Sequence, residues 1–281
     1  MEPYLVSEVL DSRGNTVLKQ EPTVVRRTIS EETSAVMCRL LASVVEEGTA
    51  KNASVAGYSI GGKTGTSEKI DVLDENGAPT LDKIVSFVGI APMDDPEYIV
   101  LVALDTPSRA TGIYISGGVM AAPTVGAVMA DILPYLGVSQ SFPEGDAAGQ
   151  TVTVPDLVGA TRTEGEKQLK ELGITASFSG DGDTVTGQIP AAGETVPGGS
   201  QILLYLGEKP PETKAEVPDF LGMNRIQAEE AAAAAGIYIL IRGNDSVSSD
   251  VKVMAQSAKA GALVAMGTTV YLNLADLTAA D

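Results

Sequence analysis

The residues with the clearest chemical potential in this chain are Lys63, Thr64, Gly65 and Thr66, which follow two glycines. In an extended strand, Lys63 and Gly65 would point to one face, and the two threonines to the other. An ammonium group beside hydroxyls can hold a carboxylate, and an N–H group at a strand edge can stabilise an oxyanion. Glycines would also let the backbone of a ligand lie close to the strand. We therefore predict that these four residues bind substrate.

The composition restricts the chemistry that could accompany this site. The chain has no histidine and a single cysteine, Cys38. The absence of histidine removes the base of a Ser/His/Asp catalyst and the commonest transition-metal ligand. One cysteine can form neither an internal disulfide nor a cysteine metal cluster, and its apolar helical surroundings predict a core position. We expect no metal and no cofactor.

The charge of the chain argues against two classes of partner. Nineteen basic and 37 acidic side chains give a formal net charge of −18 over 281 residues. A nucleic acid backbone or an anionic membrane surface would be repelled by such a protein. The acidic pairs at 94–95 and 181–183 do not show the ligand series of an EF-hand and are interpreted as loop carboxylates. We expect no nucleic acid partner.

The elements that would position the site are predicted from apolar periodicity. Residues 5–10 and 16–20 indicate two short strands, and a helix is expected from Thr28 or Ser30 to Gly48, with one apolar face packed on a sheet. The substrate residues would begin the first strand of an antiparallel meander, whose other strands are 84–90 and 98–104. A helix over 121–135 should follow, with Pro123 in its first turn. The longest apolar stretch, 119–130, is too short to cross a bilayer.

The second half of the chain contains an internal repeat. Residues 154–159 recur as 217–222 at an offset of 63, and residues 188–206 recur as 256–274 at an offset of 68. Each copy indicates strand, helix, strand, strand. The helices are expected over 161–172 and 224–235, and Gly173 and Gly236 should end them in a left-handed conformation. Residues 139–150 read as a linker, and the Pro-Pro segment 208–214 predicts separate repeats joined by a short stiff connection.

These motifs together resemble a known family. The Lys-Thr-Gly motif and the segments 48–50, 61–68, 86–92 and 118–133 resemble the C-terminal half of a class B penicillin-binding protein transpeptidase domain. The repeats resemble PASTA domains, and the order of transpeptidase then tandem PASTA is more specific than either piece. The resemblance implies an α+β fold, in which part of a β-lactamase-like antiparallel sheet with helices precedes two small β-α-β-β domains. The implied domains are 1–138 (transpeptidase), 151–207 and 215–276 (PASTA), with linkers at 139–150 and 208–214.

The resemblance also assigns roles to the candidate site. Lys63, Thr64 and Thr66 would line the transpeptidase cleft, where the threonine hydroxyls bind the carboxylate of a D-Ala-D-Ala stem peptide or a β-lactam. The N–H group of Thr66 would supply half of an oxyanion hole. The nucleophile of the family is the serine of Ser-x-x-Lys, whose lysine can act as base, so histidine is unnecessary.

Two motifs of the family are not found at the expected places. Ser-x-x-Lys occurs once, at Ser249 and Lys252 in the second repeat, and is interpreted as a chance match, while Ser-x-Asn does not occur. In the family both precede Lys-Thr-Gly, so they would lie before Met1. We therefore expect a transpeptidase fragment that is inactive by itself, with a marginally stable first module. The apolar face formed by Val36, Leu40 and Val44 would lack a partner.

The expected function is peptidoglycan crosslinking during cell-wall synthesis and cell division, on the extracytoplasmic face of a bacterial membrane, through a parent protein whose anchor is not in this chain. Expected partners are stem peptides or muropeptides, β-lactams and other cell-wall synthesis proteins. A non-catalytic alternative is that the PASTA pair binds muropeptide or acts as a spacer. Two Asn-x-Ser sequences, at Asn52 and Asn244, match a glycosylation sequon, which has no meaning in a bacterial protein.

Overall fold

A computed structural model describes residues 2–142 and 150–278 of the chain. By their internal contacts the residues form two compact units, Met1–Arg39 and Leu40–Asp281. Part of the linker predicted at 139–150 therefore lies outside the described residues.

The first unit contains an antiparallel hairpin of β1 (Glu8–Leu10) and β2 (Thr16–Lys19). Asp11 holds the turn, since its Oδ1 accepts hydrogen bonds from the N–H groups of Arg13 (2.8 Å) and Asn15 (2.9 Å). A hydrogen bond from the Asn15 side chain, and then these two backbone bonds, lower the pKa of Asp11. Both predicted strands are present. The first of them begins at Glu8, three residues later than the predicted start.

Helix α1 (Glu31–Glu46) confirms the predicted helix, and Ser30 caps it by accepting a hydrogen bond from the Thr33 N–H at 3.2 Å. Its apolar face is only partly covered. Val36 and Leu40 are 44% and 54% exposed, and Val45 in the last turn is buried. This exposure agrees with the expectation that the apolar face of the helix lacks a partner, and its last turn contacts the core through Val45. Cys38 is half-buried rather than a core residue.

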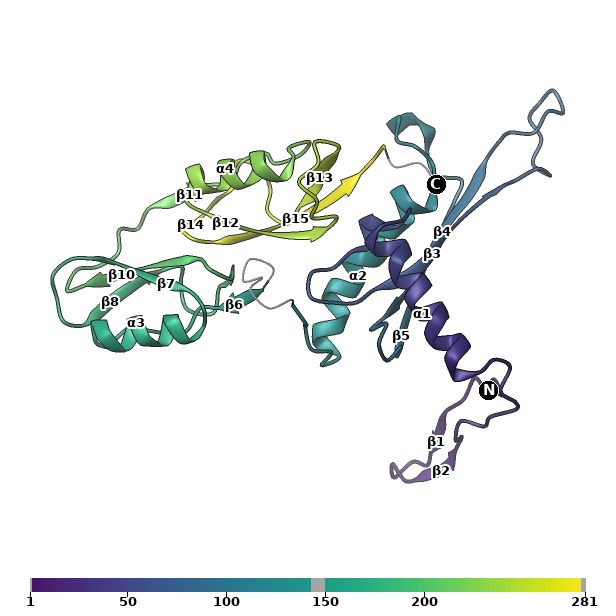
Figure 1. Ribbon diagram of the computed structural model, residues 1–281, viewed down its shortest axis with the longest axis horizontal. Helices are drawn as coiled ribbons and strands as arrows, with labels where there is room; N and C mark the ends of the chain where they lie inside the picture. Colours follow the sequence, from purple (N-terminus) through teal and green to yellow (C-terminus); the bar gives the residue numbers. More distant parts are fainter. Residues whose placement is uncertain (1, 143–149, 279–281) are drawn as a thin grey trace. The chain divides into compact units, whose positions relative to one another are not determined.

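The predicted meander is confirmed as a three-stranded antiparallel sheet in the order β3-β4-β5 (Figure 1). The strands are β3 (Gly61–Glu68), β4 (Lys83–Ala91) and β5 (Tyr98–Asp105), and the short 3-10 turn η2 (Arg109–Thr111) follows. In the central strand, Val85, Phe87 and Ala91 alternate with more exposed residues and are fully buried. This period of two places one face of the sheet on the core.

The core helix α2 (Ala122–Tyr135) covers that face with Val125, Met129 and Leu133, all fully buried. A π-helical turn, η3 (Gly117–Ala121), leads into α2, and Pro123 lies in its first turn as predicted. The continuous helical segment Gly117–Tyr135 has 19 residues and is long and apolar enough to cross a membrane. By length and hydropathy it exceeds the apolar stretch 119–130, which was expected to be too short to cross a bilayer, but half of its most apolar window is buried, which is typical of a core helix.

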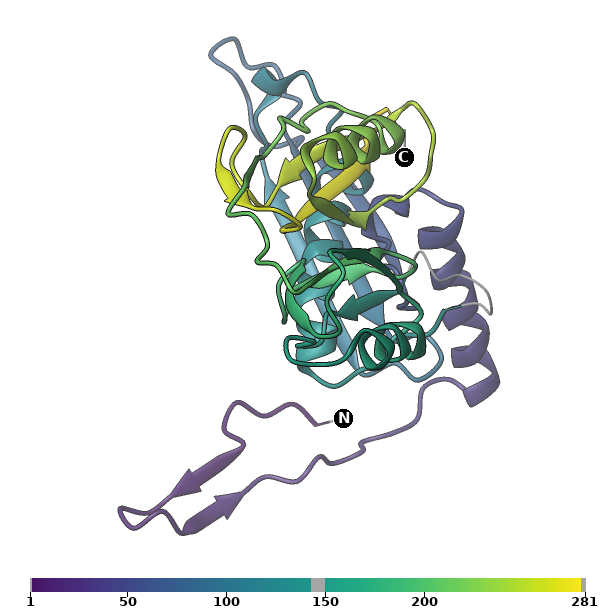
Figure 2. The ribbon, with the colours of Figure 1, turned by 90° about the vertical axis from the view of Figure 1, so that its left-hand side faces the viewer.

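Each repeat folds as a helix on a three-stranded sheet, plus a two-stranded ribbon (Figures 1 and 2). The first repeat consists of β6 (Thr151–Thr153), α3 (Arg162–Glu171), β7 (Thr175–Ser179), β8 (Val185–Ile189), β9 (Thr195–Pro197) and β10 (Gln201–Leu206). The second consists of β11 (Lys214–Glu216), α4 (Arg225–Ala235), β12 (Tyr238–Gly243), β13 (Val251–Gln256), β14 (Leu263–Ala265) and β15 (Thr269–Asp276).

The two sheets have the same topology, because in each the last strand lies between the other two. β10 pairs parallel to β7 and antiparallel to β8, and β15 pairs in the same way with β12 and β13. The predicted helices are confirmed, and Gly173 and Gly236 follow them at φ values of 72° and 71°. The strand expected before each helix is β6 or β11, and an additional strand, β9 or β14, pairs with it in a two-stranded ribbon.

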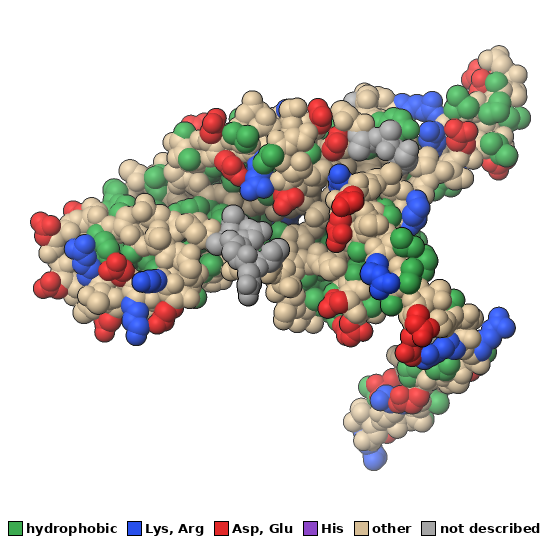
Figure 3. All heavy atoms as spheres, viewed as in Figure 1, with side chains coloured by type: hydrophobic (Ala, Val, Ile, Leu, Met, Phe, Trp, Pro, Cys, Tyr) green, Lys and Arg blue, Asp and Glu red, His purple; other side chains and the backbone are tan. Residues whose placement is uncertain are grey.

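The repeats contact each other, contrary to the expectation of separate units on a stiff connection. The Tyr238 hydroxyl donates a hydrogen bond to the Gln201 carbonyl at 2.6 Å, and the Thr269 hydroxyl donates to the Thr195 carbonyl at the same distance. On the face drawn in Figure 3, acidic and basic side chains are interspersed over both repeats.

Candidate functional site

The predicted substrate residues lie on β3, the outer strand of the described sheet. In the antiparallel register with β4, Lys63 is opposite Val88, Thr64 is opposite Phe87, and Thr66 is opposite Val85. Lys63 and Thr66 are exposed, while Thr64 is half-buried. A strand in this position has backbone groups on its outer side that a ligand strand could pair with.

Lys63 and Thr64 form a small polar cluster with Thr49. The Lys63 ammonium donates to the Thr64 carbonyl at 3.2 Å and lies 3.3 Å from the Thr64 hydroxyl. The Thr64 and Thr49 hydroxyl oxygens are 3.4 Å apart. Although Lys63 and Thr64 alternate along the strand, the long lysine side chain bends toward the threonine. One cation and two hydroxyls are thus brought to one place, which is the chemistry suited to a carboxylate.

Thr66 lies beside the η3 turn instead of in this cluster. The Gly117 N–H points to the Thr66 hydroxyl, with 3.4 Å between nitrogen and oxygen. A side chain at Gly117 would bring a Cβ atom within 2.2 Å of the Ser86 carbonyl oxygen and 3.1 Å of the Gly65 nitrogen. Only glycine therefore permits this close approach of η3 to β3.

The glycines of the motif have a structural use within the sheet. A Cβ atom at Gly62 would lie 2.2 Å from the Val88 carbonyl oxygen, and one at Gly65 would lie 2.7 Å from the Ser86 hydroxyl. These residues thus allow β3 to pack against its neighbours. Their predicted role in admitting a ligand backbone stays a prediction.

Two residues near the site were not among the predicted site residues. Thr49 comes from the loop after α1, and Gly117 begins η3, so both reach β3 from other parts of the sequence. The segments 48–50 and 118–133 drew attention through the family resemblance alone. The contacts of Thr49 and Gly117 with β3 depend on tertiary packing, which no local pattern encodes.

The remaining motifs lie apart from this cluster. Ser249 is exposed in the turn before β13, and Lys252 is on that strand, as expected of a chance Ser-x-x-Lys match. Asp94, Asp95, Asp181 and Asp183 are exposed loop residues. Within residues 2–142 and 150–278, no group of three or more His, Cys, Asp or Glu side chains is arranged to hold a metal ion.

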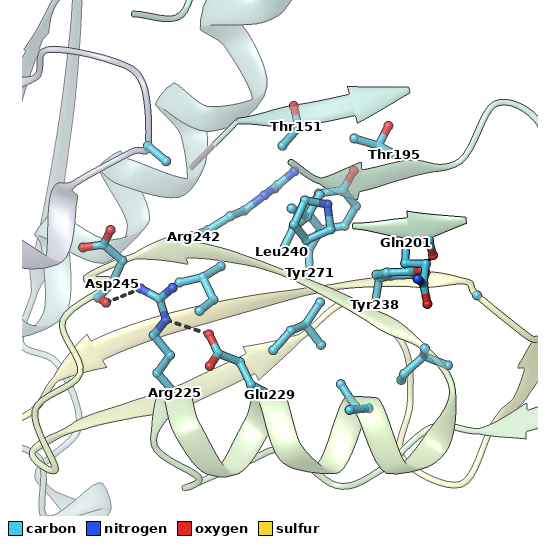
Figure 4. A pocket seen from close by; sticks show the side chains of 18 of the residues that line it. Thr151, Thr195, Gln201, Arg225, Glu229, Tyr238, Leu240, Arg242, Asp245 and Tyr271 are labelled. Atoms are coloured by element: carbon cyan, nitrogen blue, oxygen red, sulfur yellow. Dashed lines mark hydrogen bonds and ion pairs between the residues drawn. The ribbon is translucent and has the colours of Figure 1, made fainter. Parts of the chain in front are cut away.

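A cavity of about 840 Å³ lies where α2 meets the two repeats (Figure 4). Arg225 is fixed at its wall by Glu229, at 2.8 Å, and by the Asp245 carbonyl oxygen, at 2.9 Å. The Arg242 guanidinium lies 4.3 Å from the centre of the Tyr271 ring. The cavity therefore combines apolar walls with two oriented cations.

Comparison with protein families defines the class of the chain. Residues 1–130 match the model of the penicillin binding protein transpeptidase domain, and residues 152–208 and 215–276 each match the PASTA domain. The chain therefore contains a segment of a penicillin-binding protein transpeptidase domain followed by two PASTA domains, and the predicted resemblance and α+β fold class are confirmed.

Individual relatives agree with this class. The chain is 41% identical over 223 residues to stage V sporulation protein D of Bacillus subtilis, a match that covers 76% of the chain and 33% of that protein. It is 37% identical over 148 residues to a probable peptidoglycan D,D-transpeptidase FtsI of Caulobacter vibrioides, covering 46% of the chain and 24% of the relative. The chain thus spans a third or less of the length of these two proteins.

The chain is also similar to a solved structure, the transpeptidase domain of penicillin-binding protein 3 from Burkholderia pseudomallei. It is 35% identical to the chain, and the match covers 44% of the chain and 36% of that domain, with a TM-score of 0.37. The fold assignment rests on the family models and on the described strands and helices.

Proposed function

We propose that residues 63–66 are the substrate-binding strand of a serine-type D,D-transpeptidase that crosslinks peptidoglycan and is acylated by β-lactams. The observation that carries this proposal is the cluster of Lys63, Thr64 and Thr49 on the outer strand of a sheet that lies within a transpeptidase-family segment. The Thr64 and Thr66 hydroxyls bind the carboxylate of a D-Ala-D-Ala stem peptide or a β-lactam. The Thr66 N–H contributes to an oxyanion hole.

The chain contributes binding rather than the nucleophile in this proposal. Its one Ser-x-x-Lys sequence is in the second repeat. The cluster of Lys63, Thr64 and Thr49 contains an ammonium group and two hydroxyls, and the sequence has no histidine that could act as a general base. The acylated serine and its lysine would come from a part of the parent protein not given in this sequence. This 281-residue chain is then a binding-competent and catalytically inactive portion of the enzyme.

The proposal includes the organisation and location of the parent protein. The transpeptidase portion is 1–138, the PASTA domains are 151–207 and 215–276, and the connecting segments are linkers. The enzyme works at the extracytoplasmic face of the bacterial cell membrane with other cell-wall synthesis proteins. The peptidoglycan D,D-transpeptidase named among the relatives supports a role in the cell envelope.

Ligand titration of the isotope-labelled chain with ampicillin tests the site. We expect amide shifts at residues 63–66 and at Thr49, and a Thr64→Val substitution should weaken binding about tenfold, because it removes a hydrogen bond to a charged group. Thr16→Val on the exposed β2 strand is a matched control. Unchanged spectra at millimolar ampicillin would argue against the site.

Gel analysis with a fluorescent penicillin tests the missing nucleophile separately. We expect no covalent label on this chain, since the proposal places the acylated serine elsewhere. Labelling of any serine within residues 1–281 would show that the chain has its own nucleophile.

The second candidate function is muropeptide binding by the PASTA pair, and the cavity of Figure 4 favours it. Arg225 and Arg242 are cations suited to the carboxylates of a stem peptide, which would replace their ion pairs with Glu229 and Asp131 on binding. Titration with a soluble muropeptide should then shift resonances of Tyr238 and Tyr271. Arg162→Ala, which alters the equivalent arginine of the first repeat outside the cavity lining, is a control that should leave these shifts unchanged. Spectra that do not change would favour a spacer role.

A further inference from the structure

The two asparagines of the Asn-x-Ser sequences meet in the folded chain. The Asn244 amide nitrogen lies 3.4 Å from the Asn52 side-chain oxygen, although 192 residues separate them. Asn52 is 2% exposed and Asn244 is 7% exposed. Both belong to the second compact unit, where Asn52 lies in the short helical turn η1 (Lys51–Ala53) beside α2 and Asn244 directly follows β12. Their burial calls for a structural explanation.

Asn52 uses the whole hydrogen-bonding capacity of its side chain. Its Nδ2 donates to the carbonyl oxygens of Gly118 (3.1 Å) and Asp276 (3.0 Å), and its Oδ1 accepts from the Asp276 N–H (2.8 Å) in addition to Asn244. An amide has two donor hydrogens and two acceptor lone pairs, and all four are occupied. The side chain thereby joins the end of β15 in the second repeat to the η3 turn of the transpeptidase segment.

The second repeat is built to reach Asn52 from its own side. The Asn244 N–H donates to the Leu274 carbonyl at 3.0 Å, which fixes the main chain of Asn244. Its side-chain oxygen accepts from the Ser246 N–H at 3.1 Å, which orients the side chain. Arg242 forms a flanking ion pair with Asp131 of α2 at 2.9 Å. The contact is therefore polar, directional and specific to the second repeat.

The η3 turn links this contact to the proposed substrate strand. Asn52 binds the Gly118 carbonyl, and the preceding residue, Gly117, directs its N–H to the Thr66 hydroxyl. Since Gly117 is packed against Gly65 and Ser86 with no space for a side chain, a shift of η3 would be transmitted to β3. Asp276, Asn52, η3 and Thr66 form a continuous series of contacts.

We propose that Asn52 is a positioning residue through which docking of the second PASTA domain holds η3, and with it Thr66, in the geometry for ligand binding. This inference rests on the proposed function of Thr66. Linkage requires the coupling to be reciprocal: a ligand on β3 that favours the docked arrangement must also tighten the contact at Asp276.

Amide hydrogen exchange in the complete chain tests this positioning role, because it reports local opening residue by residue. Asn244→Ala removes a contact on the repeat and leaves Asn52 and the transpeptidase segment unaltered. We expect exchange about fivefold faster at Gly117, Gly118 and Asp276, with β5 unchanged, as for loss of one hydrogen bond. Asn52→Ala should have a larger effect at the same amides. If the Asn52→Ala variant does not fold, the exchange measured in Asn244→Ala decides the question.

Two substitutions serve as controls. Asp276→Asn should have no effect, since Asn52 binds the main chain of Asp276. Asn76→Ala alters an exposed asparagine in the loop between β3 and β4 and should also leave exchange at η3 unchanged. Unchanged exchange at Gly117 and Gly118 in Asn244→Ala would overturn the inference, as would equal acceleration in β5, which would indicate general destabilisation.

Ampicillin provides a readout that a purely structural role would not move. When it binds the native chain, exchange at Asp276 should slow, and Asn244→Ala should abolish that slowing. Binding without any change at Asp276 would overturn the positioning role. Absence of binding contradicts the proposed function instead, and the comparison of variants without ligand still decides whether the repeat holds η3.

Discussion

The two PASTA repeats share their internal construction and differ in what they contact. In the first, Gln188 accepts from the Leu157 N–H at 2.8 Å and donates to the Pro155 carbonyl at 2.9 Å. In the second, Gln256 accepts from the Phe220 N–H at 2.8 Å and donates to the Pro218 carbonyl at 3.1 Å. The glutamine therefore ties the Val-Pro-Asp loop to the sheet in both copies, which explains why both motifs recur.

The difference lies in the segment between the first and second strands of the three-stranded sheet. The offset between the copies rises there from 63 to 68 residues, so the second repeat is five residues longer. Its β12 and the following loop contain Arg242 and Asn244, which contact Asp131 and Asn52 of the transpeptidase segment. The comparison teaches that the repeat core is constant while the lengthened segment forms a docking surface.

The largest expected effect comes from removing a core side chain that both repeats share. Leu157 and Phe220 are equivalent and fully buried. Leu157→Ala should cost about 2–5 kcal/mol and Phe220→Ala about 3–5 kcal/mol of local stability, because each leaves a cavity. Hydrogen exchange in α3 and α4 measures the two losses separately. Val158→Ala and Leu221→Ala, at neighbouring positions that are each 56% exposed, should cost little, and comparable losses there would contradict the assigned core.

Substitution of the shared glutamine should have the next largest effect. Gln188→Ala and Gln256→Ala each leave a buried backbone N–H and carbonyl without their partner, so we expect a loss of about 1–3 kcal/mol in the affected repeat. Urea titration followed by hydrogen exchange in each sheet measures it. Gln→Glu variants retain the acceptor but place a carboxylate against two carbonyl oxygens, so they should destabilise the repeat at least as much as alanine. A large loss in one repeat alone would show that the copies are not built alike.

A smaller effect is expected from the ion pair found only in the second repeat. Asp131 is 67% exposed, so its pair with Arg242 should contribute about 0.2–1 kcal/mol to docking. A double-mutant cycle with Arg242→Ala and Asp131→Ala separates the pair from the contact of Arg242 with Tyr271. The coupling should decrease at high salt. A coupling that does not respond to salt would point to packing instead of charge.

The smallest expected difference concerns pH. Thr161 and Glu164 cap α3, whereas Asn224 and Gln227 cap α4 with uncharged groups. Hydrogen bonds from Thr161 lower the pKa of Glu164 from 4.5, so its stabilising contribution is complete above that value and is lost as pH falls through the lower value of the folded state. Hydrogen exchange at the start of α3 should therefore accelerate in acid relative to α4. Glu164→Gln should remove the difference, and persistence of the difference would assign it to another group.

Local patterns predicted the elements that have strong signals of their own. The meander, the core helix and both repeat helices followed from apolar period, capping residues and the stop glycines Gly173 and Gly236. The strand expected before each helix is present as β6 and β11, but the three-residue strands β9 and β14 that pair with them were missed, because so few residues show no alternation. For α1, apolar periodicity indicated a face that could be buried without identifying what covers it, and the exposed Val36 and Leu40 agree with the expectation that this face lacks a partner.

The candidate site was predictable only in part. Lys63 to Thr66 were recognisable because the motif is contiguous, but their assignment as substrate residues stays a prediction. Thr49 and Gly117 approach β3 through tertiary packing, and the contact of Asn52 with Asn244 joins distant segments. Both asparagines occur in the same Asn-x-Ser pattern, and this local pattern could not indicate that the two side chains meet.

The hydroxyl of Tyr238, which bonds to Gln201 across the two repeats, gives the protein an intrinsic optical probe of their association. Burial raises the pKa of this phenol above 10.0, so the neutral form and its hydrogen bond persist to higher pH than in an exposed tyrosine. The stabilisation is present below 10.0 and is lost as pH rises through the folded-state value. Burial also raises the pKa of Tyr58 and Tyr98. The chain has no tryptophan and eight tyrosines, so the difference in phenolate absorbance between the native chain and a Tyr238→Phe variant would report separation of the repeats without any added label.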